Sequence, residues 1–193
     1  DWQAISADWR TKQIEYTWVR SLAGPSHHRD FWRLTEEALA WTAARHHIND
    51  APLLADVLHA YRSLDAYPEV PAMLDRLGKL GIPRAILSNG EPGMLGDAVR
   101  AAGIDVGLDA VLSVETVGVF KPDPRVYRLA ADCFGGEASS MAFVSSNPWD
   151  AFGAAGFGFQ VFWVNRNGVP AEYDLHRLAT ELPDLTSLPD RLV

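Results

Sequence analysis

The sequence changes its pattern near Tyr67, and this change limits what the chain can fold into. Before Tyr67, apolar side chains recur every three or four residues, the spacing that places them on one face of a helix. After it, short apolar runs bounded by turn residues alternate with segments of helical pattern, as in chains that form a buried parallel sheet. We therefore predict a helical domain over residues 1–66 and an α/β domain over residues 67–193.

The first domain is predicted to be a small helical bundle. Its opening helical pattern stops at Gly24 and Pro25, which interrupt helices. A second periodic segment begins at Phe31, and a third follows Pro52, a residue favoured in the first turn of a helix. Apolar stripes on three consecutive helices need one another to become buried, and this is the reason for predicting a bundle.

The second domain is predicted to be a doubly wound α/β fold, because strands and helices alternate along it. The predicted strands are Ala85–Leu87, Ala110–Leu112, Met141–Val144 and Phe159–Val164. The predicted helices are Val70–Leu80, Met94–Ala102, Pro124–Phe134 and Pro148–Ala155, with Gly135 and Gly156 as stops. We make no prediction for the conformation of the polar segment after Val169.

Composition limits the kinds of binding partner and the cellular compartment that we expect. Seventeen Lys and Arg against 25 Asp and Glu give a formal charge of -8, and no basic run is present, which argues against a nucleic-acid partner. Cys133 is the one cysteine, so no internal disulfide is possible, and we expect it to be a buried apolar residue of its helix. No apolar stretch approaches the ~20 residues that span a bilayer, so we expect a cytoplasmic protein without a membrane partner.

Polar residues follow three of the predicted strands. Ser88, Asn89 and Gly90 come after the first, Lys121 lies in the loop after the second, and Ser145 to Asp150 follow the third. Alone, these would be an ordinary turn, a solvated lysine and a helix cap. Ligands of parallel sheets bind beyond the carboxyl ends of the strands, so three such segments at successive strand ends predict one site.

These segments resemble the haloacid dehalogenase superfamily, and within it the L-2-haloacid dehalogenases. The resemblance covers most of the chain and is carried by Trp9–Trp18, Arg20–Leu22, Ala85–Gly90, Val119–Pro122, Arg125–Tyr127 and Phe143–Asp150. It implies a sheet-containing core with a helical cap domain. In the magnesium-dependent phosphatases of the superfamily, an aspartate that binds the metal stands where this chain has Ser146. We therefore predict a site without metal or cofactor, in which the cations Arg10 and Lys121 neutralise the substrate.

The resemblance also implies a mechanism for short L-2-haloacids. An aspartate attacks C2, expels halide and forms an ester, and water then cleaves the ester to release a D-2-hydroxy acid. Lys121, supported by Tyr127 and Ser145, would keep the attacking carboxylate ionised. Asn147 and Asp150 would place and activate the hydrolytic water.

The remaining predicted site residues handle the substrate. Arg10 would receive the halide beside Asn89 and Phe31, and Ser88 would bind the substrate carboxylate. Ile14, Phe31 and Trp149 would line the apolar pocket. Without the surrounding motif, Arg10 is an ordinary surface arginine of an amphipathic helix. For the aromatic residues, core packing is the competing interpretation.

Two features depart from the family pattern. The loop from Pro25 to Arg29, with His27 and His28, has no counterpart that we can match, and such a pair is more often solvated than a metal site. The family's nucleophilic aspartate, on a strand that should precede residue 1, is absent. We expect the numbering to begin within a longer natural protein, since a chain that starts at Asp1 would be inactive.

Two other functions are compatible with the same pattern. The chain could be a phosphatase of the superfamily, which chelation of metal ions would inactivate. It could instead be a non-catalytic module that pairs with another copy through its helical domain. The family resemblance implies a homodimer, with a halogenated carboxylic acid as substrate and halide as product.

Overall fold

The computed structural model describes all 193 residues, with eight α-helices and five strands. Two compact units result from the contacts within the chain, and each is described by itself. Unit 1 comprises Asp1–Asp65, Ser88–Gly103 and Ser113–Phe120. Unit 2 comprises Ala66–Leu87, Ile104–Leu112 and Lys121–Val193. The first of these divisions lies one residue from the domain boundary expected from the sequence. The two short segments that group with unit 1 were not expected there.

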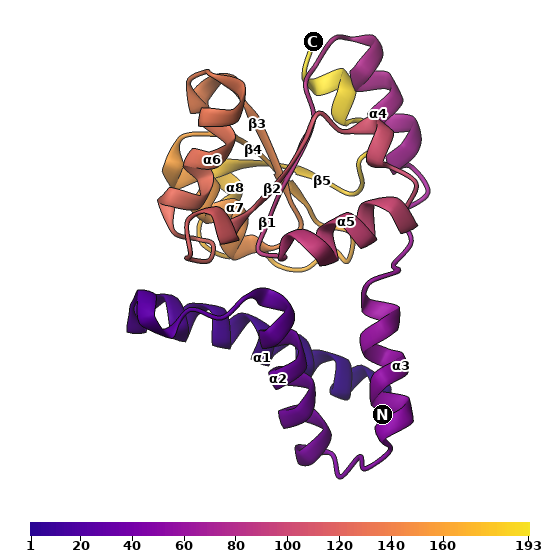
Figure 1. The fold of residues 1–193 in the computed structure, drawn as a ribbon. Coiled ribbons are helices and arrows are strands. Elements are labelled where there is room, and N and C mark those ends of the chain that lie inside the picture. The colour runs from indigo at the N-terminus through magenta and orange to yellow at the C-terminus, as the bar shows by residue number, and fades with distance from the viewer. The chain divides into compact units, whose positions relative to one another are not determined.

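Helices α1 (Trp2–Ala23), α2 (Phe31–Arg45) and α3 (Ala51–Tyr61) form most of unit 1 (Figure 1). Helix α1 ends where predicted, at Gly24, whose φ of 104° favours glycine. Asp30 and Asp50 begin the next two helices by accepting hydrogen bonds from backbone N–H groups. Helices α1 and α2 pack side by side, and the buried Gln13 amide donates to Thr35 Oγ1 at 2.9 Å.

Two later segments of the chain, Ser88–Gly103 and Ser113–Phe120, also belong to unit 1. They contain helix α5 (Pro92–Ala101) and the last residues of the strands β1 (Ala85–Ser88) and β2 (Ala110–Ser113). The Arg62 guanidinium, at the end of α3, lies 2.8 Å from Asp97 Oδ2 on α5. It also lies 3.9 Å from the centroid of the Trp32 ring. Ser113 Oγ donates to the Gly90 carbonyl at 2.7 Å. These contacts explain why the polar residues after β1 belong to the same unit as the helices.

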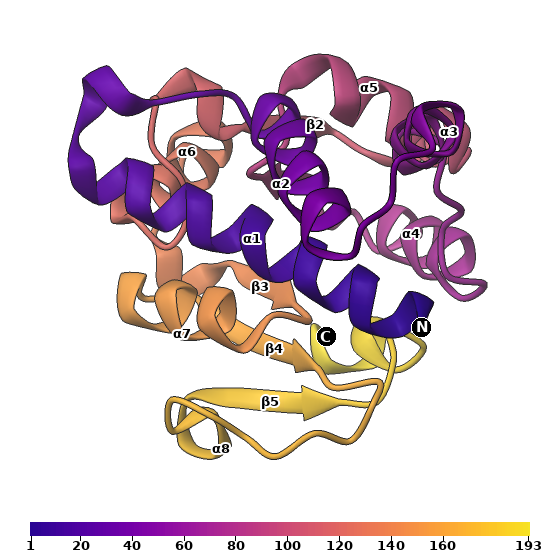
Figure 2. The ribbon, with the colours of Figure 1, turned by 90° about the horizontal axis from the view of Figure 1, so that it is seen from below.

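The strands form two sheets, in the orders β1-β2 and β3-β4-β5. In the second, β4 (Gln160–Val164) lies between β3 (Ala142–Ser145) and β5 (Ala179–Leu182), and both pairings are parallel (Figure 2). Helices α4 (Val70–Lys79), α6 (Pro124–Phe134), α7 (Pro148–Phe157) and α8 (Leu175–Leu178) complete unit 2. The structure confirms the predicted α/β class, with α8 and β5 in the segment left without a prediction.

Unit 2 has two apolar clusters. One joins α6, α7, β3 and β4 through aromatic residues that include Tyr127, Phe143 and Trp163. The other lies between α4 and the C-terminal turn (Leu188–Arg191), which are neighbours in Figure 1, and includes Leu74 and Leu188. No helix combines the length and apolar character needed to cross a membrane.

Two local predictions were wrong. Cys133 is exposed, because it lies in the last turn of α6, where Asp132 and Phe134 are exposed as well. Gly156 does not end its helix. The stop is Gly158, which has a φ of 113° and donates its N–H to the carbonyls of the preceding turn.

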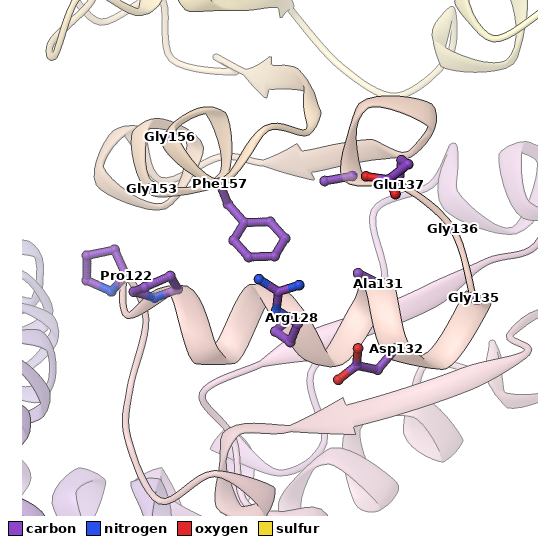
Figure 3. A pocket seen from close by; sticks show the side chains of 12 residues that line it. Pro122, Arg128, Ala131, Asp132, Gly135, Gly136, Glu137, Gly153, Gly156 and Phe157 are labelled. Atoms are coloured by element: carbon purple, nitrogen blue, oxygen red, sulfur yellow. The ribbon is translucent and has the colours of Figure 1, made fainter.

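A groove of about 1060 Å³ runs between α6 and α7 (Figure 3). Arg128 and Phe157 point toward each other across it, with the guanidinium carbon 5.2 Å from the ring centroid. Gly153 and Gly156 lie on the α7 side but differ in their surroundings. A methyl group at position 153 would lie 2.5 Å from the Tyr127 hydroxyl oxygen, whereas position 156 has open space.

This difference gives a matched pair of variants. Gly153→Ala is expected to lower the free energy of unfolding by about 1–3 kcal/mol, because the added methyl group displaces Tyr127. Gly156→Ala is expected to raise it by about 0.5–1 kcal/mol, because alanine favours a helix. Urea denaturation of both variants measures the two values. Equal effects at the two positions would contradict the close approach of α6 and α7.

Candidate active site

A buried ion pair joins two of the residues predicted to act in catalysis. Lys121 Nζ lies 3.1 Å from Asp150 Oδ2, and each side chain is 7% exposed. Lys121 comes from the loop that leads into α6, and Asp150 from the first turn of α7. Removing two charges from water costs several kcal/mol per ion, so such a pair needs further hydrogen bonds.

Two hydroxyl groups supply those hydrogen bonds. Ser145 Oγ, at the carboxyl end of β3, donates to Asp150 Oδ2 at 2.9 Å. The Tyr127 hydroxyl, on α6, donates to Asp150 Oδ1 at 2.9 Å. Both carboxylate oxygens of Asp150 are thus hydrogen-bond acceptors within unit 2, one of them twice. The four side chains form what we call the Asp150 cluster: Lys121, Tyr127, Ser145 and Asp150.

Burial and charge act in opposite directions on Lys121. Burial lowers the pKa of its ammonium group, and the negative charge and hydrogen bond of Asp150 oppose that shift. The Phe143 ring adds a favourable contact, with its centroid 4.9 Å from Lys121 Nζ. The pKa of the Tyr127 hydroxyl is raised well above its usual value, by burial and then by the nearby Asp150 charge. Tyr127 is therefore a hydrogen-bond donor at every physiological pH.

Asn147 and Trp149 lie beside the Asp150 cluster in sequence, at the start of α7, and both are half-buried. The Asn147 N–H donates to Ser145 Oγ at 3.2 Å, so this serine joins the end of β3 to the start of the helix. Ser146, between them, is exposed. No group of three or more His, Cys, Asp or Glu side chains is placed to hold a metal ion.

The other predicted site residues belong to unit 1. Ile14 and Phe31 are buried, at 8% and 6% exposure, on α1 and at the first position of α2. Arg10 lies one turn before Ile14 and is exposed. Ser88 Oγ accepts a hydrogen bond from the Gly90 N–H at 3.0 Å, which shapes the turn that holds Asn89. The structure thus brings four of the predicted residues together in the Asp150 cluster, and the roles of all of them remain predictions.

Two contacts were missed by the sequence analysis. Phe143, whose ring lies against Lys121, could have been considered because it is an aromatic residue two positions before Ser145. The His28 ring hydrogen-bonds to Glu115, 87 positions away, and no local pattern announces such a pair.

Comparison with known proteins places this geometry in a family. A model of haloacid dehalogenase-like hydrolases matches residues 4–158, most of the chain. The chain belongs to this family. Among the hydrolases it is similar to, (S)-2-haloacid dehalogenase 4A of Burkholderia cepacia is 41% identical over 96% of this chain and 80% of that protein. The (S)-2-haloacid dehalogenase of Pseudomonas sp. (strain YL) is 46% identical over 85% of this chain and 70% of that protein.

The structural comparison agrees with the sequence comparison. The L-2-haloacid dehalogenase from Xanthobacter autotrophicus is 36% identical, with a TM-score of 0.87. The match covers 97% of this hydrolase and 84% of that chain. The family resemblance inferred from the motifs is therefore confirmed.

Breaking the buried ion pair is expected to destabilise this hydrolase. Asp150→Asn leaves the Lys121 ammonium group buried without a counter-charge and should lower the free energy of unfolding by about 3–5 kcal/mol. Asp132→Asn, which removes the same charge from an exposed position of α6, should change it by less than about 0.5 kcal/mol. Urea denaturation at pH 7 compares the two. Similar small losses for both would contradict the paired arrangement.

Proposed function

We propose that the protein is a hydrolytic L-2-haloacid dehalogenase, which converts short L-2-haloacids to D-2-hydroxy acids and halide. The observation that carries the proposal is the Asp150 cluster, in which a buried cation and two hydroxyl groups surround a carboxylate. Relatives described as (S)-2-haloacid dehalogenases, 41% and 46% identical, support the same reaction.

The reaction proceeds in two displacements. The nucleophile is the aspartate of the family pattern, which is distinct from Asp150. One of its carboxylate oxygens forms a bond to C2 as the carbon–halogen bond breaks, and the halide leaves with the bonding electron pair. In-line attack inverts C2. Water then adds to the carbonyl carbon of the ester, and the ester bond breaks to give the hydroxy acid and the free carboxylate. Asp150, with Asn147, positions and activates that water.

Organic cations take the place that a metal ion has in phosphatases of the superfamily. A haloacid carries one negative charge, and a unit charge pair ~4 Å apart is worth about 4 kcal/mol at an effective dielectric of ~20. Lys121, supported by Tyr127 and Ser145, orients the attacking carboxylate and keeps it ionised. Ser146 stands where the phosphatases have an acidic metal ligand, and this substitution supports turnover without a metal ion.

The remaining predicted residues handle the substrate in this proposal. Arg10 receives the departing halide with Asn89, and Ser88 binds the substrate carboxylate. Ile14, Phe31 and Trp149 form the apolar surface for the alkyl group. The burial of Ile14 and Phe31 supports this assignment, since an apolar pocket for a short side chain excludes water.

We further propose a cytoplasmic homodimer without nucleic-acid or membrane partners. The formal charge of -8 supports the absence of a nucleic-acid partner, because a surface of this charge repels phosphates. The single cysteine supports a reducing compartment.

The decisive experiment measures chloride release from L-2-chloropropionate by protein expressed from its complete natural reading frame, with and without EDTA. We expect equal rates in both conditions and D-lactate as the product, because no step needs a metal ion. Loss of activity on chelation, together with release of phosphate from phosphate esters, would support the phosphatase instead. No turnover of either substrate class would support a non-catalytic module.

A further inference from the structure

The loop from Pro25 to Arg29 holds a residue with two long-range contacts. His28 Nε2 lies 2.9 Å from Glu115 Oε2, and the two side chains are 21% and 25% exposed. The His28 ring also packs on Phe120, with centroids 5.1 Å apart and planes tilted by 30°. We call these three residues the His28 clamp. All of them lie in unit 1, so the clamp joins the helical segment to the loop that follows β2.

Glu115 depends on His28 because its other carboxylate oxygen has no hydrogen-bond partner. Oε1 of Glu115 is buried and has no hydrogen-bond partner, and Oε2 is paired with His28. A variant without the imidazole would therefore leave both carboxylate oxygens without a hydrogen bond from a side chain. The backbone of Glu115 takes part in a separate set of hydrogen bonds. Its N–H donates to Ser113 Oγ, and that hydroxyl donates to the carbonyl of Gly90. The clamp is thereby connected to the turn that holds Ser88 and Asn89.

The clamp also contacts the apolar side of the predicted pocket. The Phe31 ring packs on Phe120 with centroids 6.3 Å apart, and the Phe120 side chain is 1% exposed. The Phe120 N–H donates to Ser21 Oγ of α1 at 3.2 Å. His28 and Phe31 therefore contact the same ring, that of Phe120.

We propose that His28 is a positioning residue for substrate binding, which acts through Glu115 and Phe120 to keep Phe31 and the turn at Ser88 in place. This inference rests on the proposed function and adds to it a residue that determines how well the alkyl group fits. His28 touches no reacting atom in this account. Its loss should weaken binding of substrate in the ground state and the transition state alike.

Two variants separate the two contacts of His28. His28→Phe keeps a ring on Phe120 and removes the hydrogen bond to Glu115, whereas His28→Gln keeps a donor near the position of Nε2 and removes the ring. We expect His28→Phe to raise KM for L-2-chloropropionate about fivefold, the effect of one lost hydrogen bond, with kcat changed less than about twofold. His28→Gln should restore part of the loss. The rise should be larger for 2-chlorobutyrate, whose longer side chain reaches further along the pocket.

His27→Gln is the matched control, because His27 is the exposed neighbour in the same loop. It should leave kcat and KM unchanged. A residue that only stabilised the fold would lower the amount of active protein, which reduces the apparent kcat and leaves KM as it was. A changed KM with an unchanged kcat therefore distinguishes positioning from folding.

Glu115→Gln completes a double-mutant cycle with His28→Phe. If the two residues act as a pair, the double variant should have nearly the same KM as either single variant. Hydrogen exchange of the amides in residues 113–120 provides a readout that needs no substrate, and His28→Phe should accelerate it about fivefold. The inference would be overturned if the two single effects on KM multiplied in the double variant, or if His28→Phe left KM unchanged.

The same experiments distinguish failure of the inference from failure of the proposed function. If the wild-type protein expressed from its complete natural reading frame releases no halide from any 2-haloacid, the proposed function is overturned, and with it the role of His28 in substrate binding. The exchange measurement then reports separately whether the His28 clamp orders the loop. A wild type that releases halide, with His28→Phe unchanged in KM, overturns the inference alone.

Discussion

The ion pair between Lys121 and Asp150 is the interaction on which the rest of the structure depends. Both charges lie in the interior of unit 2, where an unpaired ammonium or carboxylate group would be strongly destabilising. The surrounding residues stabilise the buried carboxylate. Ser145 and Tyr127 donate to the carboxylate, and Gly153 leaves room for the Tyr127 hydroxyl to approach from α6. The packing of α6 against α7 and the charge arrangement at the end of β3 are thus parts of one constraint.

The predicted site residues are divided between the two units of the chain. The Asp150 cluster lies wholly in unit 2, whereas Ile14, Phe31, Ser88 and Asn89 belong to unit 1. The peptide bond between Phe120 and Lys121 joins them, so a residue that packs in one unit is covalently linked to the buried cation of the other. The role proposed for His28 involves residues of unit 1 alone, because Phe31, Ser88, Glu115 and Phe120 all belong to that unit.

Much of the fold could be predicted because its signals are local. Pro124–Phe134 was predicted to the residue, since Asp123 and Gly135 mark its ends by capping. Strand β5 was not predicted, because it has only four residues and two of them, Thr180 and Glu181, are polar and exposed. It forms a strand by pairing with β4. Lys121, Ser145 and Asp150 were identified by their places after predicted strands, whereas Tyr127 and the roles of all four residues came from the family resemblance. Their mutual contacts join positions 23 and 29 apart in sequence, and such pairings depend on the packing of helices that no local pattern specifies.

The charge state of Lys121 is the most direct test of this account. The chain has three lysines, Lys12, Lys79 and Lys121, so a sample labelled with ¹⁵N and ¹³C in lysine gives a side-chain spectrum that single substitutions can assign. We predict that Lys121 is a charged ammonium group at pH 7 because it is paired with Asp150, and that its pKa lies below the ordinary value for lysine because it is buried. A Lys121 signal typical of a neutral amine at pH 7 would contradict it, since an uncharged side chain could not neutralise the reacting anions.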